Sequence, residues 1–177
     1  MRTVGAWAQI LPGLGASVVS LPGGEVYQAL ERKVIDATEW ATPGENVISG
    51  FHEIAKYVIV PGAHQPSAPF EISVNKEEWD ALSDELKAVL DQAAELTTFE
   101  SWVRIGRLDM GALEKFRQNG NEIIYLTPET QKRAHELGKE WAAKIAADNP
   151  WFKKVMDSQD KFETEWEQVG SIRYFQR

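Results

Sequence analysis

The chain has 177 residues, of which 43% are hydrophobic and 26% are charged, and this composition is typical of one globular domain or of one large and one small domain. Its formal net charge of −8 at pH 7 argues against non-specific nucleic-acid binding, which requires a basic face, although one well-placed arginine can still hold a small anion. The sequence has no cysteine, which excludes thiolate metal sites and cysteine nucleophiles, and no apolar run approaches the ~18 residues of a membrane span.

The first forty residues predict two successive β-α units, the pattern of an α/β fold. Short β-branched runs alternate there with stretches whose apolar residues have helical spacing. The expected strands are residues 2–4, 17–21 and 34–37, and the expected helices are residues 5–11 and 25–33.

Glu39 and Trp40 follow the expected central strand directly, before the chain turns at Thr42-Pro43-Gly44. In open α/β sheets, ligands collect at the carboxyl ends of the strands. A carboxylate there offers oxygen ligands to a hard cation, and an indole offers an apolar wall. From spacing alone, the pattern favours an acid that faces water and a tryptophan that belongs to the core.

The remainder of the chain predicts a helix-rich structure with three further strands. Capping residues mark several helix starts: Asn75 precedes a short helix, Ser83 a very long one, and Thr127 a helix with proline at its first position. A helix as long as the one after Ser83 usually spans two domains or two subunits. The expected strands are residues 57–60, 70–74 and 122–126, and the other expected helices are residues 45–51 and 151–175.

Two further residues are candidates for ligand contacts. Arg2 lies on a strand that leads into a helix, so it can present a bidentate fork to a carboxylate, or it can be a frayed terminal residue. Gln65 lies in a proline-rich loop and can add an amide ligand or simply be solvated. The histidines lack metal-ligand spacing, and no GxSxG or phosphate-loop motif is present.

Five separated blocks resemble, in the right order, the solute-receptor subunits of TRAP (tripartite ATP-independent periplasmic) transporters, the DctP family. The blocks are Met1-Arg2-Thr3, Gly23-Gly24-Glu25-Val26-Tyr27-Gln28-Ala29-Leu30-Glu31, Ile35-Asp36-Ala37-Thr38-Glu39-Trp40, Tyr57 with Pro61-Gly62, and Asn149-Pro150-Trp151-Phe152-Lys153-Lys154. The similarity is greater to the branch that captures 2-oxo acids and related monocarboxylates. It extends over nearly all of this chain, but over only about the carboxyl-terminal half of a typical receptor.

The resemblance implies the carboxyl-terminal part of a two-lobed α/β periplasmic-binding-protein fold, helix-rich and with long carboxyl-terminal helices. It assigns β-α units of the second lobe to residues 1–40, and a crossover that contributes to the first lobe and hinge to residues 41–75. Residues 76–149 would supply the long helix with a second-lobe strand and helix, and residues 150–177 a dimerisation helix. Because other ligand contacts precede Arg2 in relatives, the chain resembles a truncated receptor. We expect it to bind ligand weakly or not at all and to self-associate through exposed apolar surface.

The resemblance also implies roles for individual residues. Arg2 matches the arginine that pairs with the substrate carboxylate. Glu39, by its side chain, and Trp40, by its main-chain carbonyl, match a pair that holds a sodium or calcium ion, which in turn bridges to the substrate. Trp40 would also shape the substrate pocket. Gln65 stands where relatives often carry a glutamate that contacts metal or ligand, and His64 stands where an aromatic residue is common.

The implied function is that of a periplasmic receptor, not an enzyme. It would capture a small organic acid, a 2-oxo or 2-hydroxy monocarboxylate, and deliver it to the membrane subunits of the transporter. A homodimer is expected, whereas nucleic-acid binding and direct membrane insertion are not. Two alternatives stay open: a metal-assisted enzyme with Glu39 as general base, which lacks a second convergent acid, and a helical self-association domain formed by residues 83–177.

Overall fold

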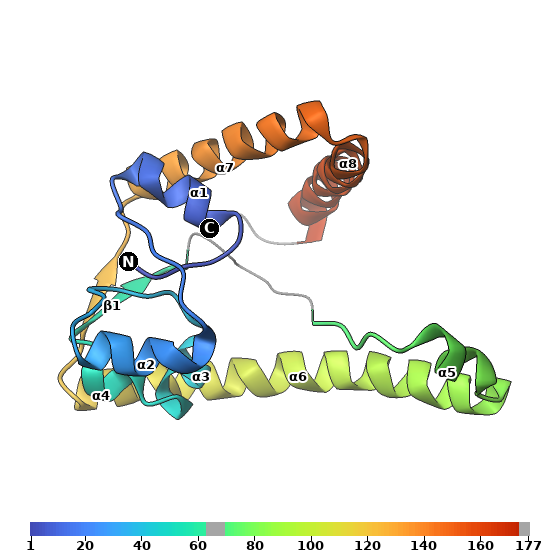
Figure 1. The fold of residues 1–177 in the computed structure, drawn as a ribbon, viewed down its shortest axis with the longest axis horizontal. Helices are drawn as coiled ribbons and strands as arrows, with labels where there is room; N and C mark the ends of the chain where they lie inside the picture. Colours follow the sequence, from blue (N-terminus) through green and yellow to red (C-terminus); the bar gives the residue numbers. More distant parts are fainter. Residues whose placement is uncertain (63–69, 174–177) are drawn as a thin grey trace. The chain divides into compact units, whose positions relative to one another are not determined.

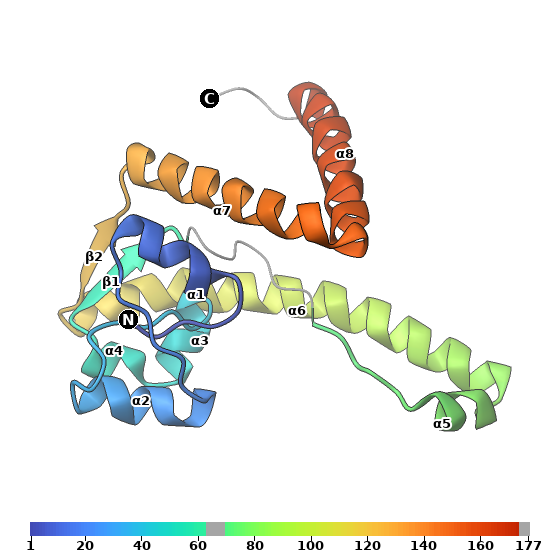
Figure 2. The same cartoon turned by 45° about the horizontal axis from the view of Figure 1, so that its top comes forward.

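The computed structural model describes residues 1–62 and 70–173, and the chain divides into two compact units (Figures 1 and 2). The first unit comprises Met1–Thr3 and Ser20–Leu126, and the second comprises Val4–Val19 and Thr127–Arg177. Each unit therefore combines two separate segments of the sequence, and those of the second unit are far apart along the chain.

The first unit contains a two-stranded parallel sheet. Strand β1 (Tyr57–Val60) pairs with strand β2 (Glu122–Tyr125), in register over all four residues. The connection between them includes helix α5 (Lys76–Ala81) and the 35-residue helix α6 (Asp84–Gln118). Both strands were predicted, and β2 ends one residue earlier than the apolar run suggests.

The capping residues of α5 and α6 are confirmed. The Asn75 side chain accepts a hydrogen bond from the Glu77 main-chain N–H at 2.8 Å, and Ser83 Oγ accepts one from the Leu86 N–H at 3.3 Å. These side chains satisfy N–H groups that have no partner within the helix. Because a cap acts locally, the sequence is sufficient to predict where these helices begin.

The expected central strand at residues 34–37 is wrong. A turn that closes helix α2 (Gly23–Glu31) occupies this place. The first two main-chain N–H groups of the run both donate to the Ala29 carbonyl, at 2.9 and 3.3 Å, and Lys33 takes the left-handed conformation with φ of 58°. Since these N–H groups close the helix, they are not available to a sheet ladder.

Three other expected strands are also wrong. Residues 2–4 and 17–21 contain one bridge residue each, Arg2 and Val19, and residues 70–74 form neither helix nor strand. Phe70 is 91% exposed and Ile72 is 89% exposed, so neither face of the segment is buried by the described part of the chain. The alternating pattern of a strand is present there, but a strand also needs a neighbour to pair with.

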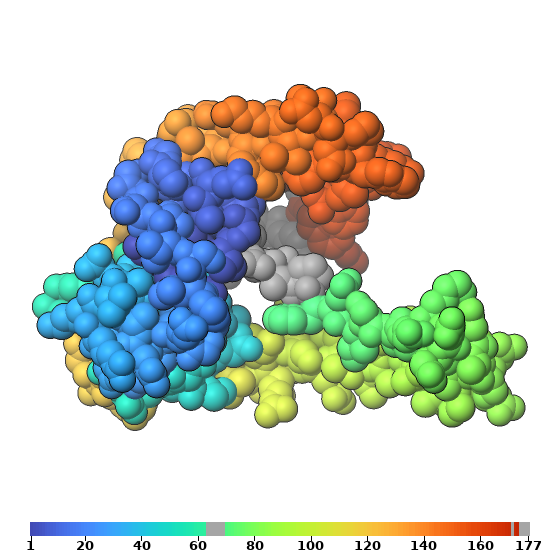
Figure 3. Space-filling model, in the orientation of Figure 1, coloured from blue at the N-terminus to red at the C-terminus, as the bar shows by residue number. Residues whose placement is uncertain are grey.

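Helices α2, α3 (Pro43–Ile48) and α4 (Phe51–Ile54) pack as one body at one end of α6 (Figures 1 and 2). The buried core of this body is the cluster of Val26, Ile35 and Phe51. The other end of α6 extends away from the body together with α5 (Figures 1 and 3). Large apolar side chains are therefore exposed along that half of α6: Leu86, Val89, Leu90, Leu96, Phe99 and Trp102.

The second unit is mainly helical, with two short helices beside a long one (Figures 1 and 2). Its elements are α1 (Trp7–Ile10), the 3-10 helix η1 (Leu11–Leu14), α7 (Pro128–Asp148) and α8 (Pro150–Arg173). As predicted, Thr127 caps α7: its Oγ1 accepts a hydrogen bond from the Thr130 N–H at 3.2 Å.

Helix α8 contacts α7 near the start of α8, where the Trp141 and Phe152 rings meet edge-on with centroids 5.7 Å apart. Further along, Phe162 and Trp166 stack on each other at 5.9 Å on an exposed surface. The exposed large apolar residues of α8 are Trp151, Val155, Phe162, Trp166, Val169 and Ile172. None of the helices in the described part of the chain combines the length and hydrophobicity needed to cross a bilayer.

The helix-rich architecture with long carboxyl-terminal helices is thus as predicted. The division of the chain into four functional segments stays a prediction.

Phe116→Ala should lower the free energy of unfolding by about 3–5 kcal/mol, because it leaves a cavity where a ring was buried. Phe116 is 1% exposed, whereas Phe99 on the same helix is 65% exposed. The matched change Phe99→Ala should therefore cost less than about 1 kcal/mol. Urea unfolding followed by circular dichroism measures both values, and equal losses would contradict the packing of α6.

Candidate functional site

Arg2 lies beside Thr38 through an isolated parallel bridge. The Arg2 N–H donates to the Ala37 carbonyl at 2.8 Å, and the Glu39 N–H donates to the Arg2 carbonyl at 3.4 Å. This pairing holds the second residue of the chain next to the segment that carries Glu39 and Trp40. Glu39 therefore follows a bridge residue rather than the end of a full strand.

The Arg2 guanidinium and the Glu39 carboxylate form a buried ion pair. Arg2 Nη1 donates to Glu39 Oε1 at 3.1 Å, and the side chains are 9% and 11% exposed. Arg2 Nε and Nη2 both donate to the Leu21 carbonyl, at 3.2 and 3.1 Å. Arg2 is therefore an anchored residue rather than a frayed terminus, and Glu39 does not face water.

Not all N–H groups of the Arg2 guanidinium take part in these contacts. Arginine has five N–H groups, and three of them donate to Leu21 and Glu39. The other two have no partner within the described ranges. The fork can thus accept a further carboxylate while it stays anchored to the Leu21 carbonyl.

The Trp40 side chain is partly buried in the core and partly exposed to solvent. Its ring packs against Phe51 with centroids 5.3 Å apart, and it lies close to Gly23 at the start of α2. The residue is nevertheless 38% exposed. Among the described residues, nothing donates a hydrogen bond to the Trp40 main-chain carbonyl. Together with the adjacent Glu39 carboxylate, this carbonyl offers the oxygen donors that sodium and calcium prefer.

Three hydrogen bonds fix the turn that follows Trp40. The Ala41 N–H donates to Asn46 Oδ1 at 3.1 Å, and the Thr42 N–H donates to Glu45 Oε2 at 3.4 Å. The third acceptor is Asp109 on α6, which lies far away in the sequence; the Gly44 N–H donates to its Oδ1 at 2.7 Å.

Sequence reasoning named none of these three acceptors, nor the Leu21 carbonyl that accepts from Arg2. A main-chain acceptor has no signature in the sequence. A side-chain partner that lies 65 positions away from Gly44 cannot be found from local patterns.

The structure does not bring all of the predicted site residues together. Gln65 and His64 lie outside the residues that the structure describes. Within the described ranges, no three His, Asp or Glu side chains converge as a metal site. His52 is buried edge-on against Phe116, and His135 is exposed on α7.

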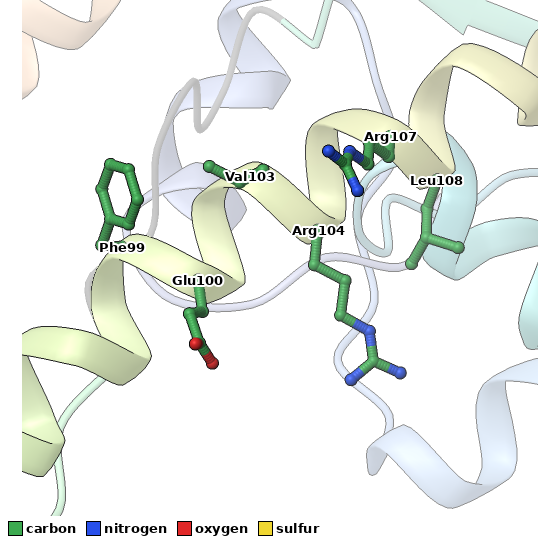
Figure 4. Close-up of a pocket in the computed structure, with 6 residues that line it drawn as sticks. All are labelled: Phe99, Glu100, Val103, Arg104, Arg107 and Leu108. Carbon is green, nitrogen blue, oxygen red and sulfur yellow. The ribbon is translucent and has the colours of Figure 1, made fainter.

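A separate hollow of about 310 Å³ lies along α6 (Figure 4). Its six lining residues come from one stretch of this helix: Phe99, Glu100, Val103, Arg104, Arg107 and Leu108. Arg2, Glu39 and Trp40 are not among them. The hollow is therefore distinct from the predicted site, and its two arginines provide a useful comparison for Arg2.

Comparisons with known proteins bear on this arrangement. The model of the family described as "Bacterial extracellular solute-binding protein, family 7" matches residues 1–149. A monocarboxylate 2-oxoacid-binding periplasmic protein of Nostoc sp. is 27% identical over 177 residues, which are 98% of this chain and 49% of the Nostoc protein.

Two solved structures show the same fold. A TRAP transporter solute-binding protein from Bordetella bronchiseptica RB50 has a TM-score of 0.87 and 26% identity, covering 98% of this chain and 52% of that one. It is a mixed-occupancy dimer, in which an active site with copurified calcium and picolinate contrasts with an apo site. A TRAP periplasmic solute-binding protein from Pseudoalteromonas atlantica T6c, with bound sodium and pyruvate, has a TM-score of 0.73 and 22% identity, covering 99% of this chain and 56% of that one. The chain thus spans about half the length of these relatives.

Arg2→Met should lower the free energy of unfolding by about 3–5 kcal/mol, because the buried Glu39 carboxylate loses its counter-charge. The double variant Arg2→Met/Glu39→Met should cost less than Arg2→Met alone, since neither charge remains. Arg133→Met is a matched control, because Arg133 and Glu140 form an exposed pair at 3.1 Å, and exposed ion pairs contribute little to stability.

Urea unfolding of wild type, Arg2→Met, Glu39→Met, the double variant and the control Arg133→Met measures this coupling. If the double variant lost the sum of the two single losses, the pair would not act as a unit.

Proposed function

The chain belongs to the bacterial extracellular solute-binding proteins of family 7, and from this premise we propose that it is the ligand-capturing component of a TRAP-type transporter for small organic acids. Members of this family are binding proteins rather than enzymes, so Glu39 is not a general base in this proposal. The observation that carries the proposal is the buried contact between Arg2 and Glu39, two residues that are 37 positions apart in the sequence.

Arg2 is the residue that we propose for the ligand carboxylate. Its two remaining N–H groups suit a bidentate contact, and its bond to the Leu21 carbonyl keeps the fork oriented. A bound carboxylate would lie close to Glu39, and the two negative charges would repel each other. A cation between them would reduce this repulsion. Binding of the anion and binding of the cation would therefore favour each other.

Glu39 and Trp40 are the residues that we propose for the cation, through the Glu39 carboxylate and the Trp40 carbonyl. The donor set supports a hard ion such as sodium or calcium, and Gln65 is proposed as a further oxygen donor. When bound, such an ion would neutralise charge and offer open coordination positions to ligand oxygens. The bound calcium and sodium of the Bordetella and Pseudoalteromonas proteins support this choice without deciding between the two ions.

A 2-oxo or 2-hydroxy monocarboxylate is the proposed ligand class. Such a ligand has a carboxylate for Arg2 and an adjacent oxygen for the cation. The Nostoc relative carries the name of a monocarboxylate 2-oxoacid-binding periplasmic protein, and this supports the class and a periplasmic location. The proposed partners are the membrane subunits of the transporter and a second copy of the chain; the exposed apolar face of α8 and the dimeric Bordetella protein support the latter.

Arg2→Ala should weaken binding of an organic acid by about 2–5 kcal/mol, because the charge partner of a desolvated carboxylate is lost. Because the chain spans about half the length of its relatives, we expect weak binding, to be followed by NMR with millimolar pyruvate in the presence of calcium. The Trp40 indole resonance reports the site, and the Nostoc relative serves as a positive control.

Arg104→Ala is the matched control, because Arg104 lies in the hollow on α6 and should leave pyruvate binding unchanged. Loss of binding in Arg104→Ala with retention in Arg2→Ala would place the ligand at α6 and contradict the proposal.

Glu39→Gln should lower calcium affinity about tenfold or more, because a neutral amide replaces a carboxylate ligand. Terbium can stand in for calcium, and its luminescence is sensitised by a nearby indole such as Trp40. The control is Glu31→Gln, on the exposed end of α2, which should not change the signal. Equal luminescence from wild type and Glu39→Gln would exclude Glu39 as a ligand.

A further inference from the structure

The segment from Glu39 to Gly44 is held at both of its ends. At the first end, the Arg2 main chain and guanidinium hold Glu39. At the other end, the Gly44 N–H donates to Asp109 Oδ1 at 2.7 Å. The hydrogen bonds from Ala41 and Thr42 go to the side chains of Asn46 and Glu45 on helix α3, so they tie the turn to the helix that follows it.

Asp109 and Gly44 meet at a close approach between α3 and α6. A Cβ atom on Gly44 would lie 2.7 Å from Leu108 Cβ and 3.1 Å from Asp109 Oδ1. Such distances leave no room for a side chain, so the first turn of α3 lies directly on α6. Because the acceptor is a charged carboxylate, this hydrogen bond is shorter and stronger than a hydrogen bond between neutral groups.

The location of this contact matters because Gly44 is only four residues from Trp40. The Trp40 ring is packed on Phe51, which fixes the indole. The main-chain carbonyl of Trp40 shares one peptide plane with the Ala41 N–H, which donates to Asn46 Oδ1 on α3, so its orientation follows the position of α3. A change at the Gly44 end therefore moves the carbonyl more readily than it moves the ring.

We propose that Asp109 is a positioning residue for the ion site: by holding Gly44 on α6, it sets the orientation of the Trp40 carbonyl relative to the Glu39 carboxylate. This inference rests on the proposed function for its use of a cation, but the geometry can be tested without one. Asp109 acts through the backbone and touches neither ion nor ligand.

The test compares Asp109→Ala, Asp109→Asn and Asp109→Glu with wild type. Asp109→Asn keeps the Oδ1 acceptor, so it should retain the wild-type properties. Asp109→Ala removes the acceptor, and Asp109→Glu displaces it by one methylene while keeping the charge. The matched controls are Asp91→Ala and Asp91→Asn, on an exposed position of the same helix, which should have no effect.

Three quantities are measured by NMR and terbium titration of the full chain. In Asp109→Ala, amide exchange at Gly44 should accelerate about tenfold with loss of its hydrogen bond. The backbone amide resonances of Trp40 and Ala41 should shift, and terbium affinity should fall about five- to tenfold. Asp109→Glu should show the same changes with smaller amplitude, and it keeps the test valid if Asp109→Ala does not fold.

The inference is overturned if Gly44 exchange accelerates while the Trp40 and Ala41 resonances and the terbium affinity stay at wild-type values. Asp109 would then have only a structural role. It is also overturned if Asp109→Asn behaves like Asp109→Ala, because the acceptor oxygen would not be the cause. If wild type binds no terbium, the proposed function fails, and the resonances of Trp40 and Ala41 alone decide the role of Asp109.

Discussion

The buried contact between Arg2 and Glu39 is the interaction on which the site depends. A charged side chain that is about one-tenth exposed is tolerated only with a partner, and each of these residues supplies the partner of the other. The contact requires Arg2 to lie beside the segment after α2, which the bridge to Thr38 ensures. It also directs the guanidinium toward the Leu21 carbonyl. The Arg2 side chain thus joins three segments of the first unit, and two of its N–H groups have no partner among the described residues.

Local signals in the sequence predicted the helices well, because a cap or a proline acts within one turn. Asn75, Ser83 and Thr127 each accept a hydrogen bond from the helix that follows. The strands were harder to predict. The β-branched run at residues 34–37 has the composition of a strand, but its N–H groups close helix α2 through the left-handed Lys33. A strand depends on a neighbour that the local pattern does not contain, and the same limit applies to residues 70–74.

The site was predictable only in part, and the family resemblance was decisive for that part. Residue patterns left Arg2 open between a fork for a carboxylate and a frayed terminus, whereas the resemblance assigned it to the substrate carboxylate. The structure places the Arg2 guanidinium against the Glu39 carboxylate, and the ligand roles of Arg2, Glu39, Trp40 and Gln65 stay predictions. The Leu21 carbonyl and Asp109 were missed, since a main-chain oxygen and a partner on a distant helix have no local signature.

The most direct test is a crystal structure of the chain grown with calcium and pyruvate. The account predicts anomalous density for calcium between the Glu39 carboxylate and the Trp40 carbonyl, with the pyruvate carboxylate on the Arg2 guanidinium. Pyruvate bound elsewhere, for instance beside Arg104 and Arg107 on α6, with no ion at Glu39, would contradict it.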